Sequence, residues 1–282
     1  MKKSFAIGKY IIKENLSNKI LNGFIIFAII ILFGTLLLKE LTIFNGETVV
    51  KDTGIFLMEF FIFLVTVFSA STYLIRDHKE KSIYLVLTKP VSRTEYIIGN
   101  VLGNIGLVII YIFIMSIILE TSLLFIGSSL NSNDAVSIFY IFGKLMILCA
   151  LGVFFAVISD SYVTANIFTF SSYVIGHFAG DILALIDKSA NPVLKGILSI
   201  LKIILPRYNT LNYRDFLLDI KPDHRSLILY ICSYTVLVTV ISSIIFEKRK
   251  NMAYLEENEW MIINEITYNT HWIYSIEDFQ TM

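Results

Sequence analysis

Six long apolar segments constrain the fold of this 282-residue chain more than any other feature of its sequence. A helix that crosses the roughly 30 Å hydrocarbon layer of a bilayer needs about 20 mostly apolar residues. Charged residues make up only 16% of the chain, which is too few to cover a water-soluble surface of this size. The sequence therefore predicts an all-α integral membrane protein whose membrane domain occupies residues 21–246. Its six transmembrane helices are expected at 21–38, 54–75, 97–119, 138–158, 162–186 and 227–246.

The distribution of Lys and Arg gives the expected orientation. Basic residues cluster before the first span, in the loop 76–96 and directly after the last span, whereas the loop 127–137 has none. Lys and Arg near span ends favour the cytoplasmic side, and an even number of spans then puts both termini in the cytoplasm. The basic loop 187–226 would lie outside. It contains a short apolar run, 193–205, which is predicted to be a re-entrant or interfacial helix because it is too short to span.

The two ends of the chain differ from the spans. Residues 1–20 have a helical pattern, with basic side chains on one side and apolar side chains on another. The apolar residues are Phe5, Ile12, Leu16 and Ile20, and the basic ones are Lys2, Lys9 and Lys13. The pattern predicts an amphipathic helix along the cytoplasmic membrane surface, with a plain basic anchor as the alternative. The acidic tail 247–282 is expected to be cytoplasmic, either disordered or docked to a partner.

The charged segment between the second and third spans is more structured than a connecting loop requires. Residues 80–87 can form a short helix, which Pro90 ends because proline disfavours helical geometry before it and lacks an N–H. Ser92-Arg-Thr-Glu95 is a capping box, and it is followed at once by the third span. Three glycines then recur on one face of that span at i+4 and i+7, which lets another helix approach closely. They are Gly99, Gly103 and Gly106.

This segment resembles the signature of ABC-2 type transporter permeases, nearest the branch associated with multicopper-enzyme maturation or general export. The resemblance rests on Glu80, Leu87 and the corner Pro90-Val91-Ser92-Arg93. It implies that the loop 76–96 contains a coupling helix, which contacts a separate ATPase in the cytoplasmic membrane of a bacterium or archaeon. The residues expected to carry this contact are Glu80, Ile83, Tyr84, Leu87, Pro90, Ser92 and Arg93.

The sequence contains no phosphate-binding loop of the form G-x4-G-K-[ST]. ATP and Mg are therefore expected on the partner ATPase, and this chain is expected to bind no cofactor of its own. The implied function is the permease subunit of an ATP-driven exporter, not an enzyme. Its expected partners are the ATPase, a second permease copy (identical or homologous) and the lipid bilayer, with no nucleic acid. The alternative is a non-transporting membrane anchor or assembly factor.

Five ionisable residues lie within the apolar segments or at their ends: Glu59, Glu120, Lys144, His177 and Asp181. At ~1.5 Å per residue, all five fall in the outer half of the predicted bundle. Such residues are costly in a membrane and usually face an interior, a partner or water. We expect an outer polar layer in which Lys144 pairs with Glu59 or Asp181. Its role is either functional, as a hydrated vestibule or a substrate contact, or structural, through pairing or through side chains that extend to the membrane interface. His177 and Asp181 alone do not make a metal site.

Overall fold

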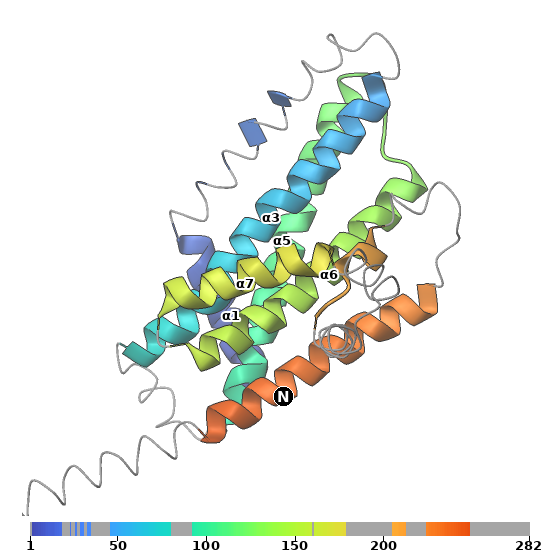
Figure 1. The fold of residues 1–282 in the computed structure, drawn as a ribbon. Helices are drawn as coiled ribbons and strands as arrows, with labels where there is room; N and C mark the ends of the chain where they lie inside the picture. Colours follow the sequence, from blue (N-terminus) through green and yellow to red (C-terminus); the bar gives the residue numbers. More distant parts are fainter. Residues whose placement is uncertain are drawn as a thin grey trace, which may run out of the picture.

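A computed structural model describes residues 2–18, 46–79, 92–159, 161–178, 205–212 and 224–248, with a few positions between 23 and 34. Every regular element in these ranges is helical (Figure 1). The elements are α1 (Lys2–Ser17), α3 (Gly46–Lys79), α5 (Arg93–Leu124), α6 (Ser132–Ile158), α7 (Tyr162–His177), the 3-10 helix η1 (Tyr208–Leu211) and a helix over His224–Lys248. The all-helical class is confirmed for this part of the chain.

Four of the described helices are long and apolar enough to cross a membrane. They are Gly46–Thr72, Arg93–Leu124, Ser132–Ile158 and His224–Lys248, and they correspond to the second, third, fourth and sixth predicted spans. The predicted first span and the second half of the fifth lie largely outside the described residues. The count of six spans therefore stays a prediction.

The helices extend further than the apolar segments that predicted them. α3 begins at Gly46 rather than at residue 54, and α6 begins at Ser132 rather than at residue 138. The reason is that apolar length measures only the part suited to hydrocarbon, whereas a helix continues until its backbone groups find another partner. At the start of α6, the amide of Asn131 donates to Asp134 Oδ2 at 2.8 Å. This local contact fixes the N-terminal end of α6 before the apolar segment 138–158 begins.

α6 is the central helix of the described bundle. Of its most apolar 18-residue stretch, 72% is buried inside the protein, against 28% for the corresponding stretch of His224–Lys248. It packs against α3, α5 and α7, and η1 also rests on it (Figure 1). Side chains presented by the middle of α6 are consequently enclosed by protein.

α1 packs against the glycine stripe of α5. A Cβ built on Gly103 would lie 3.0 Å from the carbonyl oxygen of Gly8, and one built on Gly99 would lie 2.9 Å from the carbonyl oxygen of Ser4. A Cβ on Gly106 would lie 2.7 Å from the Ile12 side chain. The predicted close approach is therefore present, and α1 is the helix that makes it.

The face that α1 buries is not its apolar side. The buried residues are Ser4, Gly8, Ile11 and Asn15. Phe5 is 73% exposed and Leu16 is 38% exposed, roughly a quarter of a turn away from the buried face. α1 therefore has a small, partly polar face for α5, while Phe5 and Leu16 of its apolar side are left outside the bundle. This arrangement agrees with a helix that lies at a membrane surface.

Candidate functional site

A cavity of about 400 Å³ lies between α3, α6, α7 and the segment that contains η1. Its walls are mostly apolar. They comprise Ile55, Phe56, Phe60, Phe63, Ile141, Phe170, Val174 and Leu211. Six polar or ionisable side chains interrupt these walls: Glu59, Ser137, Lys144, Tyr173, His177 and Asn212. A concave, mainly apolar site with a few polar groups is typical of a small-molecule site.

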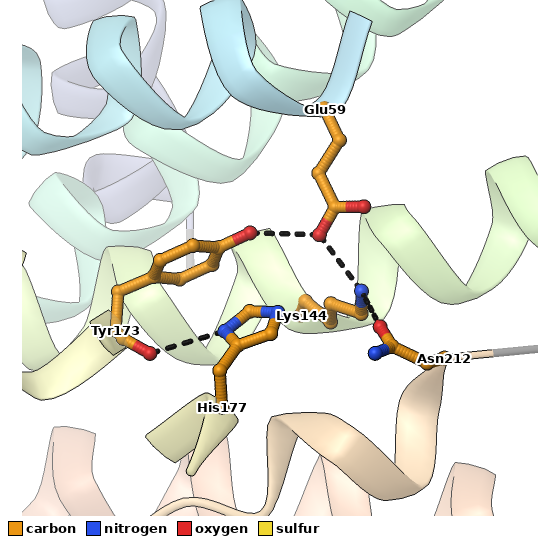
Figure 2. A network of polar contacts seen from close by, with 5 residues as sticks. All are labelled: Glu59, Lys144, Tyr173, His177 and Asn212. Carbon is orange, nitrogen blue, oxygen red and sulfur yellow. Dashed lines mark hydrogen bonds and ion pairs between the residues drawn. The ribbon is translucent and has the colours of Figure 1, made fainter. Parts of the chain in front are cut away.

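An ion pair between α3 and α6 forms the polar centre of the cavity (Figure 2). Lys144 Nζ lies 2.7 Å from Glu59 Oε1, and it also donates to Asn212 Oδ1. Tyr173 donates its hydroxyl proton to the same Glu59 oxygen at 2.7 Å. The structure thus contains one of the two predicted pairings of Lys144. The other candidate partner, Asp181, lies outside the described residues.

The two charges differ in exposure. The side chain of Lys144 is 3% exposed, whereas that of Glu59 is 17% exposed. Lys144 is enclosed because α6, the helix that carries it, lies at the centre of the bundle. Glu59 is more exposed because α3 presents its carboxylate at the cavity wall. Both residues lie roughly 20 Å along their helices from the N-terminal ends, and this places them near the middle of these helices, not close to one end. Their depth in the membrane, expected in the outer half of the bundle, stays a prediction.

Asn212 reaches Lys144 because the chain folds back into the bundle at η1. Within this segment Tyr208 is fully buried and Leu211 is 1% exposed, and the Arg207 amide donates to Tyr230 Oη at 2.9 Å. Non-helical backbone is tolerated at membrane depth only where protein or a cavity surrounds it. The predicted re-entrant or interfacial run 193–205 lies almost wholly outside the described residues, but the chain directly after it is buried.

His177 and Tyr173 form the α7 side of the site. The Tyr173 ring stacks on Phe63 with centroids 4.1 Å apart. His177 Nδ1 lies 3.1 Å from the Tyr173 carbonyl oxygen, so the imidazole donates from that nitrogen. Gly176 lets η1 approach, because a Cβ there would lie 2.5 Å from the Tyr208 ring. His177 is therefore held beside the ion pair by contacts with its own helix and with η1.

The predicted polar layer is only partly one site. Glu59, Lys144 and His177 line the same cavity, but Glu120 does not. Its carboxylate accepts from the Leu130 amide at 3.0 Å, where it supports the turn after α5. Among the described residues no group of three His, Cys, Asp or Glu side chains could hold a metal ion.

Two contacts between uncharged side chains, one buried and one partly buried, were not predicted from the sequence. Ser69 Oγ donates to Asn104 Oδ1 at 3.0 Å, and Ser71 Oγ donates to Asn166 Oδ1. These contacts join α3 to α5 and α3 to α7. Asn100 and Asn104 recur at i+4 within an otherwise apolar segment, and this spacing was the available sign of a buried polar face.

Most of the predicted coupling residues lie outside the described part of the chain, namely Glu80, Ile83, Tyr84, Leu87 and Pro90. Ser92 and Arg93 are described. The capping box is confirmed, because the Glu95 amide donates to Ser92 Oγ at 3.2 Å and the Ser92 amide donates to Glu95 Oε2 at 3.1 Å. Arg93 Nη1 donates to the Glu247 carbonyl at 3.3 Å. The loop therefore ends in a fixed connection to two helices.

The comparison with known families agrees with this arrangement. A family profile described as "ABC-2 family transporter protein" matches residues 33–251, which is more than three quarters of the chain. It covers all four candidate spans, the cavity and the loop before α5. Among curated proteins, none matches this sequence. This multi-pass membrane chain, which forms the membrane component of a transporter and not an enzyme, belongs to the ABC-2 transporter family.

Proposed function

We propose that this chain is the permease subunit of an ATP-driven exporter and that a separate ATPase drives it through the cytoplasmic loop 76–96. The permease acts with a second copy, identical or homologous, in the cytoplasmic membrane of a bacterium or archaeon. Both termini lie in the cytoplasm. Family membership supports the transporter role, and the packing around the start of α5 supports the path of coupling.

One observation carries the coupling proposal: the loop 76–96, the helix His224–Lys248 and α1 all connect to the first turns of α5. Arg93 donates to the last turn of the helix His224–Lys248, and the Tyr96 ring stacks on Phe246 with centroids 6.1 Å apart. Less than two turns further along α5, the glycine stripe holds α1. A displacement of the loop would therefore move α5, α1 and the last helix together.

The capping box makes this connection stiff. An N-cap side chain that accepts an amide of the first turn is worth about 1 kcal/mol, and here the reciprocal bond from Glu95 is present as well. The first turn of α5 is consequently a defined continuation of the loop. An ATPase that moves residues 80–91 would act on α5 directly, because only the N-cap residue Ser92 lies between them.

The first experiment tests ATPase binding. The tagged full chain is purified from its native membrane, and proteins that accompany it are identified by mass spectrometry. We expect an ABC ATPase with the unaltered chain and a loss of that ATPase with Ile83→Asp combined with Leu87→Asp. Recovery of the ATPase in equal amount with the double variant would contradict docking at this loop.

The second experiment tests coupling after binding. Arg93→Ala removes the hydrogen bond to the last helix, and we expect the ATP hydrolysis rate of the reconstituted complex to fall several-fold while the ATPase stays bound. Thr94→Ala is the matched control, because Thr94 is exposed and lies one residue further on. Equal hydrolysis rates for the two variants would refute the proposed path through Arg93.

A further inference from the structure

Among the described residues, the neighbours of Glu59 bond to only one oxygen of its carboxylate. Both of its hydrogen bonds to described residues, from Lys144 and from Tyr173, end on Oε1. Oε2 makes none within the part of the chain that the structure describes, and the side chain is 17% exposed at the cavity wall. As far as the described residues are concerned, one carboxylate oxygen is therefore open to a group inside the cavity.

The lysine is not available in the same way. Its side chain is 3% exposed, and its ammonium is directed to Glu59 and Asn212 (Figure 2). An anion in the cavity would meet the exposed carboxylate before it could reach the enclosed ammonium. The charge layout at this wall therefore favours a positive ligand, although the pair is neutral as a whole.

Aromatic rings line the same cavity as the carboxylate. Phe63 is central, with centroid distances of 4.1 Å to Tyr173, 5.4 Å to Phe170 and 6.5 Å to Phe60. Phe56 continues this row, because its centroid lies 6.3 Å from that of Phe60. The faces of aromatic rings attract cations within about 6 Å. The same rings cannot replace the water shell of a small inorganic cation, so they suit a cation with delocalised charge and apolar groups.

The side of the bundle gives access to this cavity. Phe56 and Phe60 on α3 are 60% and 42% exposed, and Phe170 and Val174 on α7 are 45% and 38% exposed. All four line the cavity, so it opens laterally between these two helices. A hydrophobic compound that is dissolved in the bilayer could enter there without crossing water.

From these observations we propose that the cavity binds a hydrophobic organic cation, with its charge against Glu59 Oε2 and its apolar groups against the Phe60 and Phe63 rings. The inference deepens the proposed function, on which it rests for its biological role, by naming a substrate class for the exporter. Glu59 and Phe60 determine specificity, and Lys144 holds the carboxylate in place.

Two ions of the same size and shape test the sign of the charge. Tetraphenylphosphonium is the positive probe, and tetraphenylborate is the matched negative control. Binding of each radiolabelled ion to the full chain in lipid nanodiscs is measured by equilibrium dialysis, and binding to empty nanodiscs is subtracted. We expect the cation to bind at least tenfold more tightly than the anion, as a single unscreened charge contact predicts. Equal protein-dependent binding of the two ions would overturn the proposal.

Two variants then test the assigned site. Glu59→Gln keeps the shape of the side chain and removes its charge, and we expect about tenfold weaker binding of tetraphenylphosphonium. The control is Glu120→Gln, a carboxylate outside the cavity. Phe60→Leu keeps an apolar wall and removes one ring, with an expected loss of about threefold to tenfold. Its control is Phe113→Leu, at a position on α5 that is 66% exposed.

Phe60→Leu leaves both charges intact, so it tests the assigned binding site even where Glu59→Gln fails to fold. Unchanged cation affinity in folded Glu59→Gln or in Phe60→Leu refutes the assigned site. The outcomes also distinguish the cation-binding inference from the proposed exporter function. A complex that hydrolyses ATP but does not bind tetraphenylphosphonium overturns this inference alone. A chain that binds the cation selectively but recruits no ATPase overturns the proposed exporter function and leaves the site.

Discussion

The enclosed ion pair makes the sharpest prediction about stability. Removing one partner of a buried pair leaves an uncompensated charge, which typically costs about 3–5 kcal/mol. Lys144→Met leaves Glu59 with only the Tyr173 hydroxyl as a described donor, and Glu59→Gln leaves the 3% exposed ammonium without its counter-charge. We expect each single change to lower the free energy of unfolding by about 3 kcal/mol.

The double variant distinguishes a real pair from two independent side chains. Because neither charge is then left alone, we expect a loss of about 3–4 kcal/mol instead of about 6, which is a coupling energy of about 2–3 kcal/mol. Unfolding is followed by far-UV circular dichroism in mixed micelles of rising dodecyl sulfate content. Lys144→Met combined with Glu120→Gln is the control, and these two losses should add. Additivity within about 0.5 kcal/mol for the Glu59 cycle would refute the pairing.

Three further predictions follow from close contacts and from the cap of α5. Gly103→Ala should lower the free energy of unfolding by about 1–3 kcal/mol, because the new Cβ would lie 3.0 Å from the α1 backbone; Gly34→Ala, with nothing within 4 Å, should not. Ser92→Ala should cost about 1 kcal/mol and speed amide exchange in the first turn of α5; unchanged exchange would contradict the cap. Gly176→Ala should lower the melting temperature, because its Cβ would lie 2.5 Å from the Tyr208 ring; an equal melting temperature would refute that packing.

The elements that the sequence predicted well are those with local causes. The apolar length of a segment indicates a span because the bilayer requires about 20 such residues in a row. The start of α5 was predictable because Ser92 and Glu95 exchange bonds within four residues. Family membership was predictable for the same reason, since the motif from Glu80 to Arg93 is short and contiguous.

The glycine stripe shows where local information ends. Gly99, Gly103 and Gly106 predicted a close helix neighbour because they lack side chains, but they could not say which helix it would be. In the structure the neighbour is α1. Hydrophobic periodicity did not reveal this, because the buried face of α1 includes Ser4 and Asn15 while Phe5 stays exposed. Around a membrane, an apolar side chain is as well placed outside the bundle as inside it.

The sequence by itself determined that the chain is a helical membrane protein, that Ser92 caps the start of α5, and that Lys144 requires a partner. Only the tertiary structure chose Glu59, because that contact depends on how α3 and α6 turn toward each other across 85 residues of chain. Asn212, which accepts a hydrogen bond from Lys144, lies directly after η1 in a segment that folds back into the bundle. No periodicity predicts such a return, since its backbone is stable at that depth only when other helices already surround it.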